Sequence, residues 1–312
     1  MADTAILLTT YNGSRWLPAQ LDSLLSQTDR DFVIWIHDDG SSDDTMKIVE
    51  KYCKDFPGMI RAADYPPAGG AKQNFFSLMR HVDADWYFFC DQDDIWLPDK
   101  VARSRKAVMR MREKYGDIPL AVFGDMYVAD MEGNIIQPSY LQYMKRDPRK
   151  LSLRQLLREN KAAGCTMVIN RQLAREALRF RQEENIVMHD WWLMLTAAAL
   201  GRIGFINSPL LLYRQHGDNQ IGAGKSTLAW AREKAGNLLE GKQYRSSMKG
   251  ILEQRRMAGE LAGLLPANHP DKAFLEELAE IGNSPKPERM KFYREHPLLP
   301  DDSRNRWKIW IV

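Results

Sequence analysis

Residues 86–94, Trp-Tyr-Phe-Phe-Cys-Asp-Gln-Asp-Asp, decide the fold, because five apolar residues run without a break into a cluster of acidic residues. An unbroken apolar run of this length predicts a strand that is buried on both faces, as the strands of parallel sheets are. The acidic residues mark the point where the strand ends and a loop begins. This stretch therefore predicts a buried central strand with a polar carboxyl end.

Two other apolar runs, at residues 5–8 and 32–36, have the same form and also end in polar clusters. Helical spacing of apolar residues follows each run, and Ser14 is a suitable N-cap for the first helix. A long helical pattern at about residues 98–115 precedes a further apolar run at 120–123. Strands that alternate with helices in this way predict an α/β fold with a mostly parallel, mixed sheet flanked by helices.

Polar side chains gather at three of the predicted strand ends. They are Thr10, Tyr11 and Asn12, then Asp38 and Asp39, then Asp91, Gln92, Asp93 and Asp94. Because ligands of open α/β sheets bind at the carboxyl ends of the strands, we expect these side chains to share one rim. Asp91 and Asp93 are two residues apart, so an extended backbone would turn both carboxylates to one side. Such a pair suits Mg²⁺, Mn²⁺ or ribose hydroxyls, and an acidic loop that caps the next helix is the alternative.

The second half of the sequence is less regular than the first. Residues 164–169 predict a strand, and residues 190–200 predict a helix whose N-cap could be Asp190. Apolar runs at 203–206 and 210–213 predict two more strands.

From Lys225 onward the pattern is helical and mildly basic, with 16 basic and 12 acidic residues. We therefore expect a domain at residues 1–224 and a helical extension at 225–312. Apolar positions such as Leu228 and Leu275 predict that the extension packs on this domain or on another subunit of a homo-oligomer. At residues 304–312, basic side chains alternate with Trp and Ile, which suits a membrane surface, with ordinary packing as the alternative.

Composition and cysteine usage restrict the class of protein and the cellular compartment that we expect. The chain has 312 residues, of which 44% are hydrophobic and 27% charged, and this excludes disordered and coiled-coil classes. A net charge of +3 gives no reason to expect a nucleic-acid partner. The three cysteines form no CxxC pair, and neither a secretory signal nor a run of about 18 apolar residues is present. We expect a cytoplasmic protein that is at most peripheral at the inner face of the cell membrane.

The polar clusters carry a resemblance to a known family. Residues 8–12 (Leu-Thr-Thr-Tyr-Asn), 38–41 (Asp-Asp-Gly-Ser) and 91–99 (Asp-Gln-Asp-Asp-Ile-Trp-Leu-Pro-Asp) resemble the nucleotide-sugar half of the family-two glycosyltransferases, which have the GT-A fold. Residues 188–192 (Met-His-Asp-Trp-Trp) and 213–219 (Tyr-Arg-Gln-His-Gly-Asp-Asn) resemble the bacterial rhamnosyltransferase branch of that family. The resemblance covers about residues 4–222.

This resemblance implies a role for each matching position. Thr10, Tyr11 and Asp39 would hold the base of a nucleotide-sugar donor whose nucleotide is dTDP or UDP. The full set of donor-binding residues would be Thr10, Tyr11, Asn12, Asp39, Lys72, Asn74, Asp91, Gln92, Asp93 and Arg214. Asp93, with Asp91 and His216, would hold Mn²⁺ or Mg²⁺ at the diphosphate. Asp190 would be the general base, and Trp191 and Trp192 would contact the acceptor.

The implied activity is metal-dependent, inverting transfer of a sugar to a polysaccharide or a polyprenyl-linked glycan. L-Rhamnose from dTDP-rhamnose is the donor that the rhamnosyltransferase motifs imply. A transferase that uses a UDP-hexose or UDP-galactofuranose is one alternative. A non-catalytic module that binds a nucleotide sugar or a glycan on the same scaffold is another.

Two other nucleotide-binding classes are rejected from the sequence. Residues 222–227, Gly-Ala-Gly-Lys-Ser-Thr, end like a phosphate-binding P-loop, but that motif needs Gly at the position of Asn219. The first strand is not followed by GxGxxG, which argues against a dinucleotide-binding dehydrogenase. We interpret residues 222–227 as a flexible, basic connector.

Overall fold

In the computed structural model, which describes residues 3–216 and 242–298, the predicted apolar runs become strands of one sheet. The strand order is β3-β2-β1-β4-β8-β6-β9-β5, and β7 pairs with β6. The strands β3, β2, β1 and β4 are parallel, β8 is antiparallel to β4 and β6, and β6 is parallel to β9. Their bounds are β1 Thr4–Thr10, β2 Val33–Asp38, β3 Ile60–Ala62, β4 Trp86–Asp91, β5 Ile95–Trp96, β6 Leu120–Ala129, β7 Ile135–Gln137, β8 Met167–Asn170 and β9 Arg202–Arg214. The predicted mostly parallel, mixed sheet is confirmed.

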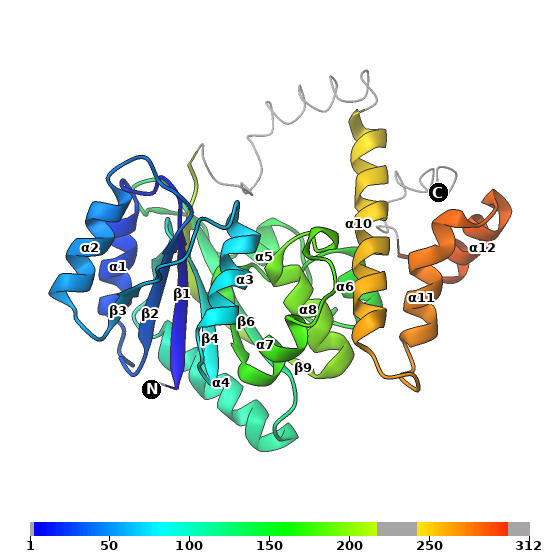
Figure 1. The fold of residues 1–312 in the computed structure, drawn as a ribbon, viewed down its shortest axis with the longest axis horizontal. Helices are drawn as coiled ribbons and strands as arrows, with labels where there is room; N and C mark the ends of the chain where they lie inside the picture. The colour runs from blue at the N-terminus through cyan, green and yellow to red at the C-terminus, as the bar shows by residue number, and fades with distance from the viewer. Residues whose placement is uncertain (1–2, 217–241, 299–312) are drawn as a thin grey trace.

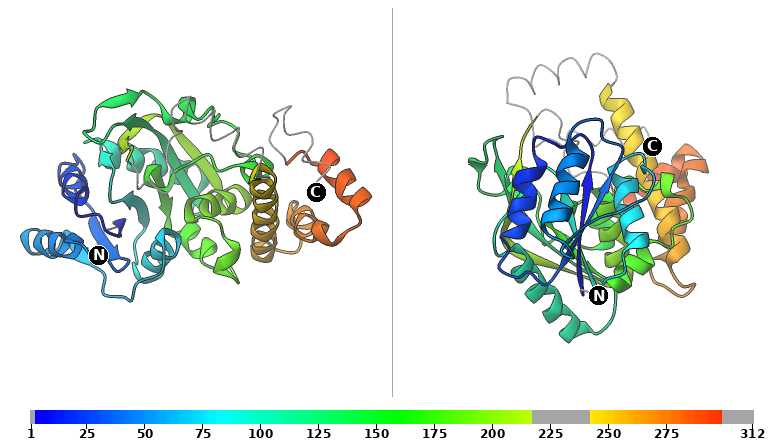
Figure 2. Two further views of the ribbon diagram at one scale, coloured as in Figure 1. Left: turned by 90° about the horizontal axis from the view of Figure 1, so that it is seen from above. Right: turned by 60° about the vertical axis from the view of Figure 1, so that its left-hand side comes forward.

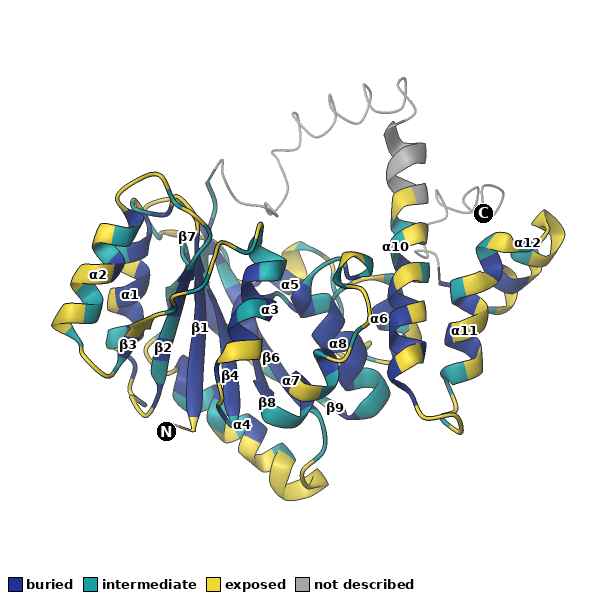
Figure 3. Cartoon of the chain, in the orientation of Figure 1, coloured by how far each residue is buried: buried dark blue, intermediate teal, exposed yellow. Residues whose placement is uncertain are grey.

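The centre of the sheet is formed by β1 and β4, the strands with the least interrupted apolar sequences. All residues of β1 are buried, and β4 is buried up to Asp91, which is partly exposed. The two strands pair in parallel, which places Thr9 beside Asp91. Figure 3 shows the buried class concentrated in these strands and on the inner faces of the helices. The hydrophobic core therefore supports the ends of β1 and β4, where the polar clusters begin.

Helices cover the sheet, as Figures 1 and 2 show. The helix α3 packs against β1, β2 and α8, whereas α4 packs against β6, β8 and β9. Short 3-10 helices, η1, η2 and η3, lie between the longer elements. The helical bounds are α1 Leu17–Leu25, α2 Thr45–Asp55, α3 Ala71–His81, α4 Lys100–Tyr115, α5 Tyr140–Tyr143, α6 Leu153–Arg158, η1 Gly164–Thr166, α7 Arg171–Ala177, η2 Glu183–Asn185, α8 His189–Leu200, α10 Lys242–Leu264, α11 Lys272–Glu280, η3 Ile281–Asn283 and α12 Lys286–Glu295.

Three local predictions were wrong in detail. Ser14 does not cap α1, because the helix begins at Leu17 after Trp16, and the Ser14 amide donates to Asp43 Oδ2 instead. The strand predicted at residues 164–169 begins with the 3-10 turn η1, and only β8 pairs with its neighbours. The two strands predicted at 203–206 and 210–213 are one strand, β9, because register shifts against β6 near Asp125 absorb the break between them.

The C-terminal extension lies on the side of the molecule away from β3 (Figures 1 and 2). The helix α10 packs against α6, α8 and η2, and α11 packs against α10. Leu275, Leu278 and Ile281 are buried, which confirms the helical packing predicted for this part. The boundary at residue 224, the connector at 222–227, Leu228 and the segment 304–312 fall outside the described residues. Within the described part of the chain, no helix is long and apolar enough to cross a membrane.

Candidate active site

The loop after β2 is organised by Asp38, which fixes the first polar cluster. The Thr10 hydroxyl and the Ser41 hydroxyl both donate to Asp38 Oδ1, at 2.7 and 2.6 Å. The amides of Gly40 and Ser41 donate to Asp38 Oδ2. A short turn closed by an aspartate in this way holds the ends of β1 and β2 together. Thr10 and Asp38 therefore support the rim through hydrogen bonds within the loop.

Asp39 reaches across the rim to the loop before α3. Its Oδ1 atom accepts hydrogen bonds from the amides of Ala68 and Gly69, at 2.6 and 2.8 Å. The Tyr11 side chain is 58% exposed, so its ring lies open at the same rim. An exposed aromatic face beside an acceptor oxygen is an arrangement that suits a planar, hydrogen-bonding ligand.

Gln92 and Asn12 hold the rim loops by main-chain hydrogen bonds. Gln92 accepts from the Tyr11 amide at 2.9 Å and donates to the Tyr11 carbonyl at 3.0 Å. Asn12 Oδ1 accepts from the Ser42 amide, and the Asn12 backbone has φ 47°, a left-handed conformation that Asn tolerates. Both predicted donor-binding residues thus lie at the rim, where their side chains fix the backbone that carries Tyr11.

The acidic loop after β4 is crowded with negative charge. Burial, together with the carboxylates of Asp93 and Asp190, raises the pKa of Asp91 to about 7. Asp94 is 1% exposed, and neither of its oxygens has a hydrogen-bond partner among the described residues. Burial and the nearby Asp93 and Asp91 raise the pKa of Asp94 well above its usual range. The site therefore holds excess negative potential that a bound cation would relieve.

A buried lysine lies behind these carboxylates. Lys100 is fully buried, its ammonium group lies 3.2 Å from the centre of the Trp96 ring, and it donates to the Cys165 carbonyl. Potential ligand atoms of Asp91, Asp94 and Cys165 lie within 4.8 Å of one another. Lys100 and Cys165 were not predicted as site residues. A lysine in the first turn of a helix is ordinarily exposed, so the burial of Lys100 is visible only in the structure.

His216 and Arg214, at the end of β9, complete the acidic loop. His216 Nε2 lies 2.8 Å from Asp93 Oδ2, and its ring stacks on Trp16 at 4.6 Å. Arg214 is 5% exposed and donates to the main-chain carbonyls of Asp93 and Trp16, at 2.6 and 3.2 Å. Carboxylates and an imidazole form a donor set that fits Mg²⁺ or Mn²⁺. Of the residues predicted to hold a metal, the structure brings Asp93 and His216 into contact, whereas Asp91 lies close to Asp94 and Cys165.

Lys72 and Asn74, the predicted donor contacts on α3, point elsewhere. Lys72 Nζ donates to the carbonyls of Glu183 and Ile186, at 2.9 and 2.7 Å, and so ties α3 to η2. Asn74 is 1% exposed, and its amide side chain bonds to the ring and the carbonyl of His37. The structure places both side chains in contacts within the protein rather than open at the rim.

Asp190 lies in the first turn of α8, one residue after the helix begins, and it is not the N-cap, which is Met188. Its two oxygens accept from the amides of Trp191 and Gly164, at 2.6 and 3.2 Å. Burial raises the pKa of Asp190 to about 6, against the opposing effect of these hydrogen bonds. Its charge also raises the pKa of Asp91, after the larger effects of burial and of Asp93 on that group.

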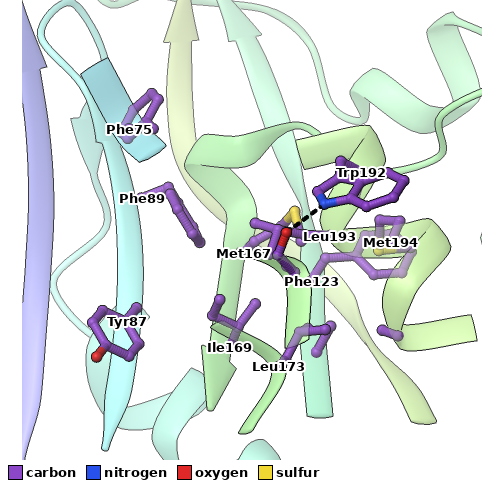
Figure 4. Close-up of a cluster of buried hydrophobic side chains, with 14 of the residues drawn as sticks. Phe75, Tyr87, Phe89, Phe123, Met167, Ile169, Leu173, Trp192, Leu193 and Met194 are labelled. Carbon is purple, nitrogen blue, oxygen red and sulfur yellow. Dashed lines mark hydrogen bonds between the residues drawn. The ribbon is translucent and has the colours of Figure 1, made fainter. Parts of the chain in front are cut away.

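The two tryptophans after Asp190 have different surroundings. Trp192 is fully buried, its indole N–H donates to the Ala177 carbonyl at 2.8 Å, and Figure 4 shows its ring among core side chains. Trp191 is partly buried, and its indole N–H donates to the Leu156 carbonyl at 2.6 Å. Of the two residues, Trp191 is the one that is not fully buried.

Residues 5–178 match the family model described as Glycosyl transferase family 2. The chain is 31% identical over 254 residues to the dTDP-rhamnosyl transferase RfbG of Shigella flexneri, an alignment that covers 78% of this chain and 83% of that protein. It is 24% identical over 232 residues to the uncharacterized glycosyltransferase alr2836 of Nostoc sp., with 72% of this chain and 68% of the relative covered.

Solved structures share the fold at lower identity. TarS 1–349 of S. aureus in complex with UDP-GlcNAc superposes with a TM-score of 0.59 at 14% identity, over 99% of this chain and 78% of that one. The mannosyltransferase PcManGT of Pyrobaculum calidifontis, in complex with GDP-Man and Mn2+, superposes with a TM-score of 0.52 at 15% identity, over 95% and 84% of the chains. These likenesses confirm the predicted GT-A fold.

Proposed function

Because the chain belongs to glycosyltransferase family 2 and is a glycosyltransferase that uses a nucleotide-sugar donor, we propose that it transfers L-rhamnose from dTDP-rhamnose with inversion. The similarity to the dTDP-rhamnosyl transferase supports the choice of donor. The observation that supports the reaction is the contact of His216 Nε2 with Asp93 Oδ2 at 2.8 Å, in the loop after Asp91, whose pKa is raised by burial and by the charges of Asp93 and Asp190.

In this proposal, the base of the nucleotide binds at the rim between β1 and β2. The exposed Tyr11 ring packs against the flat face of the thymine, as aromatic side chains do with planar ligands. Asp39 accepts a hydrogen bond from the thymine N–H while its Oδ1 atom continues to hold the loop at Ala68 and Gly69. Thr10, Asn12 and Gln92 keep this surface in place.

The diphosphate lies at the acidic loop, where Asp91, Asp93 and His216 would hold Mg²⁺ or Mn²⁺. When bound, a divalent cation neutralises the charge that develops on the leaving diphosphate. Arg214 contributes by clamping the main chain of Asp93 to β9, so it positions the loop without touching the donor. In the proposal, Lys72 and Asn74 also act through the structure, because they hold α3 in place and do not contact the donor.

Asp190 removes the proton from the acceptor hydroxyl as that oxygen attacks the anomeric carbon. A carboxyl group with a pKa of about 6 is ionised at neutral pH and is still a stronger base than an ordinary aspartate. Attack from the face opposite the diphosphate inverts the anomeric centre. The part-exposed ring of Trp191, next to the base, contacts the acceptor sugar, while Trp192 supports α8 from the core.

We assign the acceptor to the growing end of a polysaccharide or a polyprenyl-linked glycan at the inner face of the cell membrane. Residues 304–312, which alternate basic and aromatic side chains, are the proposed membrane contact. Deletion of residues 302–312 should reduce sedimentation with anionic phospholipid vesicles and leave donor binding unchanged. Equal sedimentation of the two proteins would contradict the membrane contact.

A donor panel tests the proposed function. The purified protein is mixed with Mn²⁺ or Mg²⁺, one of dTDP-rhamnose, UDP-glucose or UDP-galactofuranose, and octyl glycosides of rhamnose, glucose or N-acetylglucosamine as acceptor probes. We expect dTDP release and a lengthened glycoside only with dTDP-rhamnose. Turnover of a UDP-sugar instead would replace the donor assignment, and binding of a nucleotide sugar without any turnover would show a binding module.

A further inference from the structure

The hydrogen bond from Gly164 to the proposed base depends on an unusually close approach of two chain segments. The Gly164 amide, at the start of η1, donates to Asp190 Oδ2 at 3.2 Å. A Cβ atom at position 164 would lie 2.6 Å from His189 Nε2 and 3.6 Å from Asp190 Cβ. Since real Cβ atoms do not approach a heavy atom to 2.6 Å, any other residue at this position would displace either His189 or the η1 backbone.

The His189 ring is held firmly and cannot move aside without disturbing the core. It is 5% exposed and lies against the rings of Phe75 and Phe89, at 4.2 and 5.3 Å between centroids. Neither of its ring nitrogens has a hydrogen-bond partner among the described residues. Burial lowers the pKa of His189 to about 3, so the ring is neutral at physiological pH. It therefore acts on Gly164 by its shape and not by its charge.

We propose that Gly164 is a positioning residue for the general base, seated against the wall that the His189 ring forms, and that its amide fixes the Asp190 carboxylate toward the acceptor. The inference rests on the proposed role of Asp190. Asp190 Oδ1 bonds to the neighbouring Trp191 amide within its own helix turn. Gly164 ties the other oxygen to a segment distant in the sequence. The Asn160 side chain is a further partner of the same carboxylate, and together these bonds fix the direction in which it points.

The charged groups around Asp190 define what the loss of this bond would do. Asp91 faces it from β4, Arg146 from the loop after α5, and Tyr140 from α5 itself. The hydrogen bond from Gly164 stabilises the ionised carboxylate and so lowers its pKa, against the effect of burial. Without it, the base would be protonated at a higher pH, and activity would fall most strongly under acidic conditions.

The test compares Gly164→Ala with the wild type over pH 5–9, using the donor and acceptor found in the panel. Gly250→Ala is the matched control, because a methyl group at residue 250 of α10 meets no atom within 4 Å. We expect the acid limb of the kcat profile to move up by about one pH unit in Gly164→Ala. The loss of kcat should be about tenfold at pH 5.5 and about twofold or less at pH 8.5, with dTDP affinity and the control unchanged.

A second variant keeps the inference testable if Gly164→Ala folds poorly. The double variant His189→Ala/Gly164→Ala removes the wall and makes room for the new methyl group, so its acid limb should return toward that of the wild type. A loss of kcat in Gly164→Ala that is equal at all pH values, or no loss at all, would overturn the inference. If the wild type itself transfers no sugar from any donor, the proposed function fails instead, and the two failures are distinct.

Discussion

The acidic loop after β4 and the start of α8 each contain a carboxyl group with a raised pKa, but for different reasons. The pKa of Asp91 is raised by burial and then by its like-charged neighbours Asp93 and Asp190. The pKa of Asp190 is raised by burial, and hydrogen bonds from the amides of Trp191 and Gly164 oppose this rise. A carboxylate that is crowded by like charges is stabilised when a cation binds beside it. A carboxylate that is desolvated and well oriented is a stronger base, so it accepts a proton more readily. The two regions are therefore suited to different halves of one reaction.

The regions also differ in how the chain builds them. The proposed donor rim is made of loops that directly follow β1, β2 and β4, and neighbouring parallel strands bring those loops together. The surroundings of Asp190, the proposed base, join η1 to α8, and the His189 ring packs on rings from α3 and β4. Under the proposal, damage to the rim should impair donor binding, and damage around Asp190 should impair proton transfer.

The largest effect is expected for Asp190→Asn, which removes the base and keeps the size of the side chain. Transfer should fall by about a hundredfold to ten-thousandfold, because general-base assistance is lost. Binding of dTDP with Mn²⁺, measured by calorimetry, should stay within about twofold of the wild type, since the rim is untouched. Near-normal turnover of this variant would refute the assignment of Asp190.

The next largest effect is expected for Asp93→Ala, which removes a carboxylate from the rim. The increase in dTDP affinity that Mn²⁺ produces in the wild type should disappear, because the proposed cation ligand is lost. Asp55→Ala, at the exposed C-terminal end of α2, is the matched control and should retain the wild-type response. If Asp93→Ala responds to Mn²⁺ as the wild type does, then the cation does not bind at this loop.

The pH profile separates the two regions without a mutation. At saturating donor, kcat should fall about tenfold for each pH unit below about 6, because only the ionised form of Asp190 accepts the proton. The profile of kcat/KM should fall more steeply, since the free enzyme must also ionise Asp91, whose pKa is about 7. Rates that do not change between pH 5 and 8 would contradict both assignments.

The smallest effect concerns stability. Because the folded state raises the pKa of Asp91 from 3.8 to about 7, the metal-free protein should lose stability as the pH rises through this interval. Asp91→Asn should therefore raise the melting temperature at pH 7.5 by a few degrees, about 2–4 °C for each kcal/mol. Mn²⁺ should stabilise the wild type more at pH 7.5 than at pH 5. A lower melting temperature for Asp91→Asn in the absence of metal would contradict this account of the loop.

The sequence allowed the rim at the ends of β1, β2 and β4 to be predicted better than the surroundings of Asp190. Continuous apolar strands made the ends of β1, β2 and β4 recognisable, so Tyr11, Asp39, Asp91 and Asp93 could be placed on one rim from pattern alone. The burial of Lys100 could not be predicted, because it depends on η1, whose Cys165 lies 65 residues further along the chain. Likewise, adjacent tryptophans look alike in the sequence, and only tertiary packing sends Trp192 into the core while Trp191 stays partly exposed.

The most direct test of the division between the two regions is a crystal structure of the protein with dTDP-rhamnose and a divalent cation. We predict density for thymine against Tyr11 and Asp39, and for the cation and diphosphate at Asp91 and Asp93. The carboxylate of Asp190 should face the anomeric carbon from the side opposite the diphosphate. A nucleotide bound away from the acidic loop, or an Asp190 carboxylate on the same side as the diphosphate, would contradict the account.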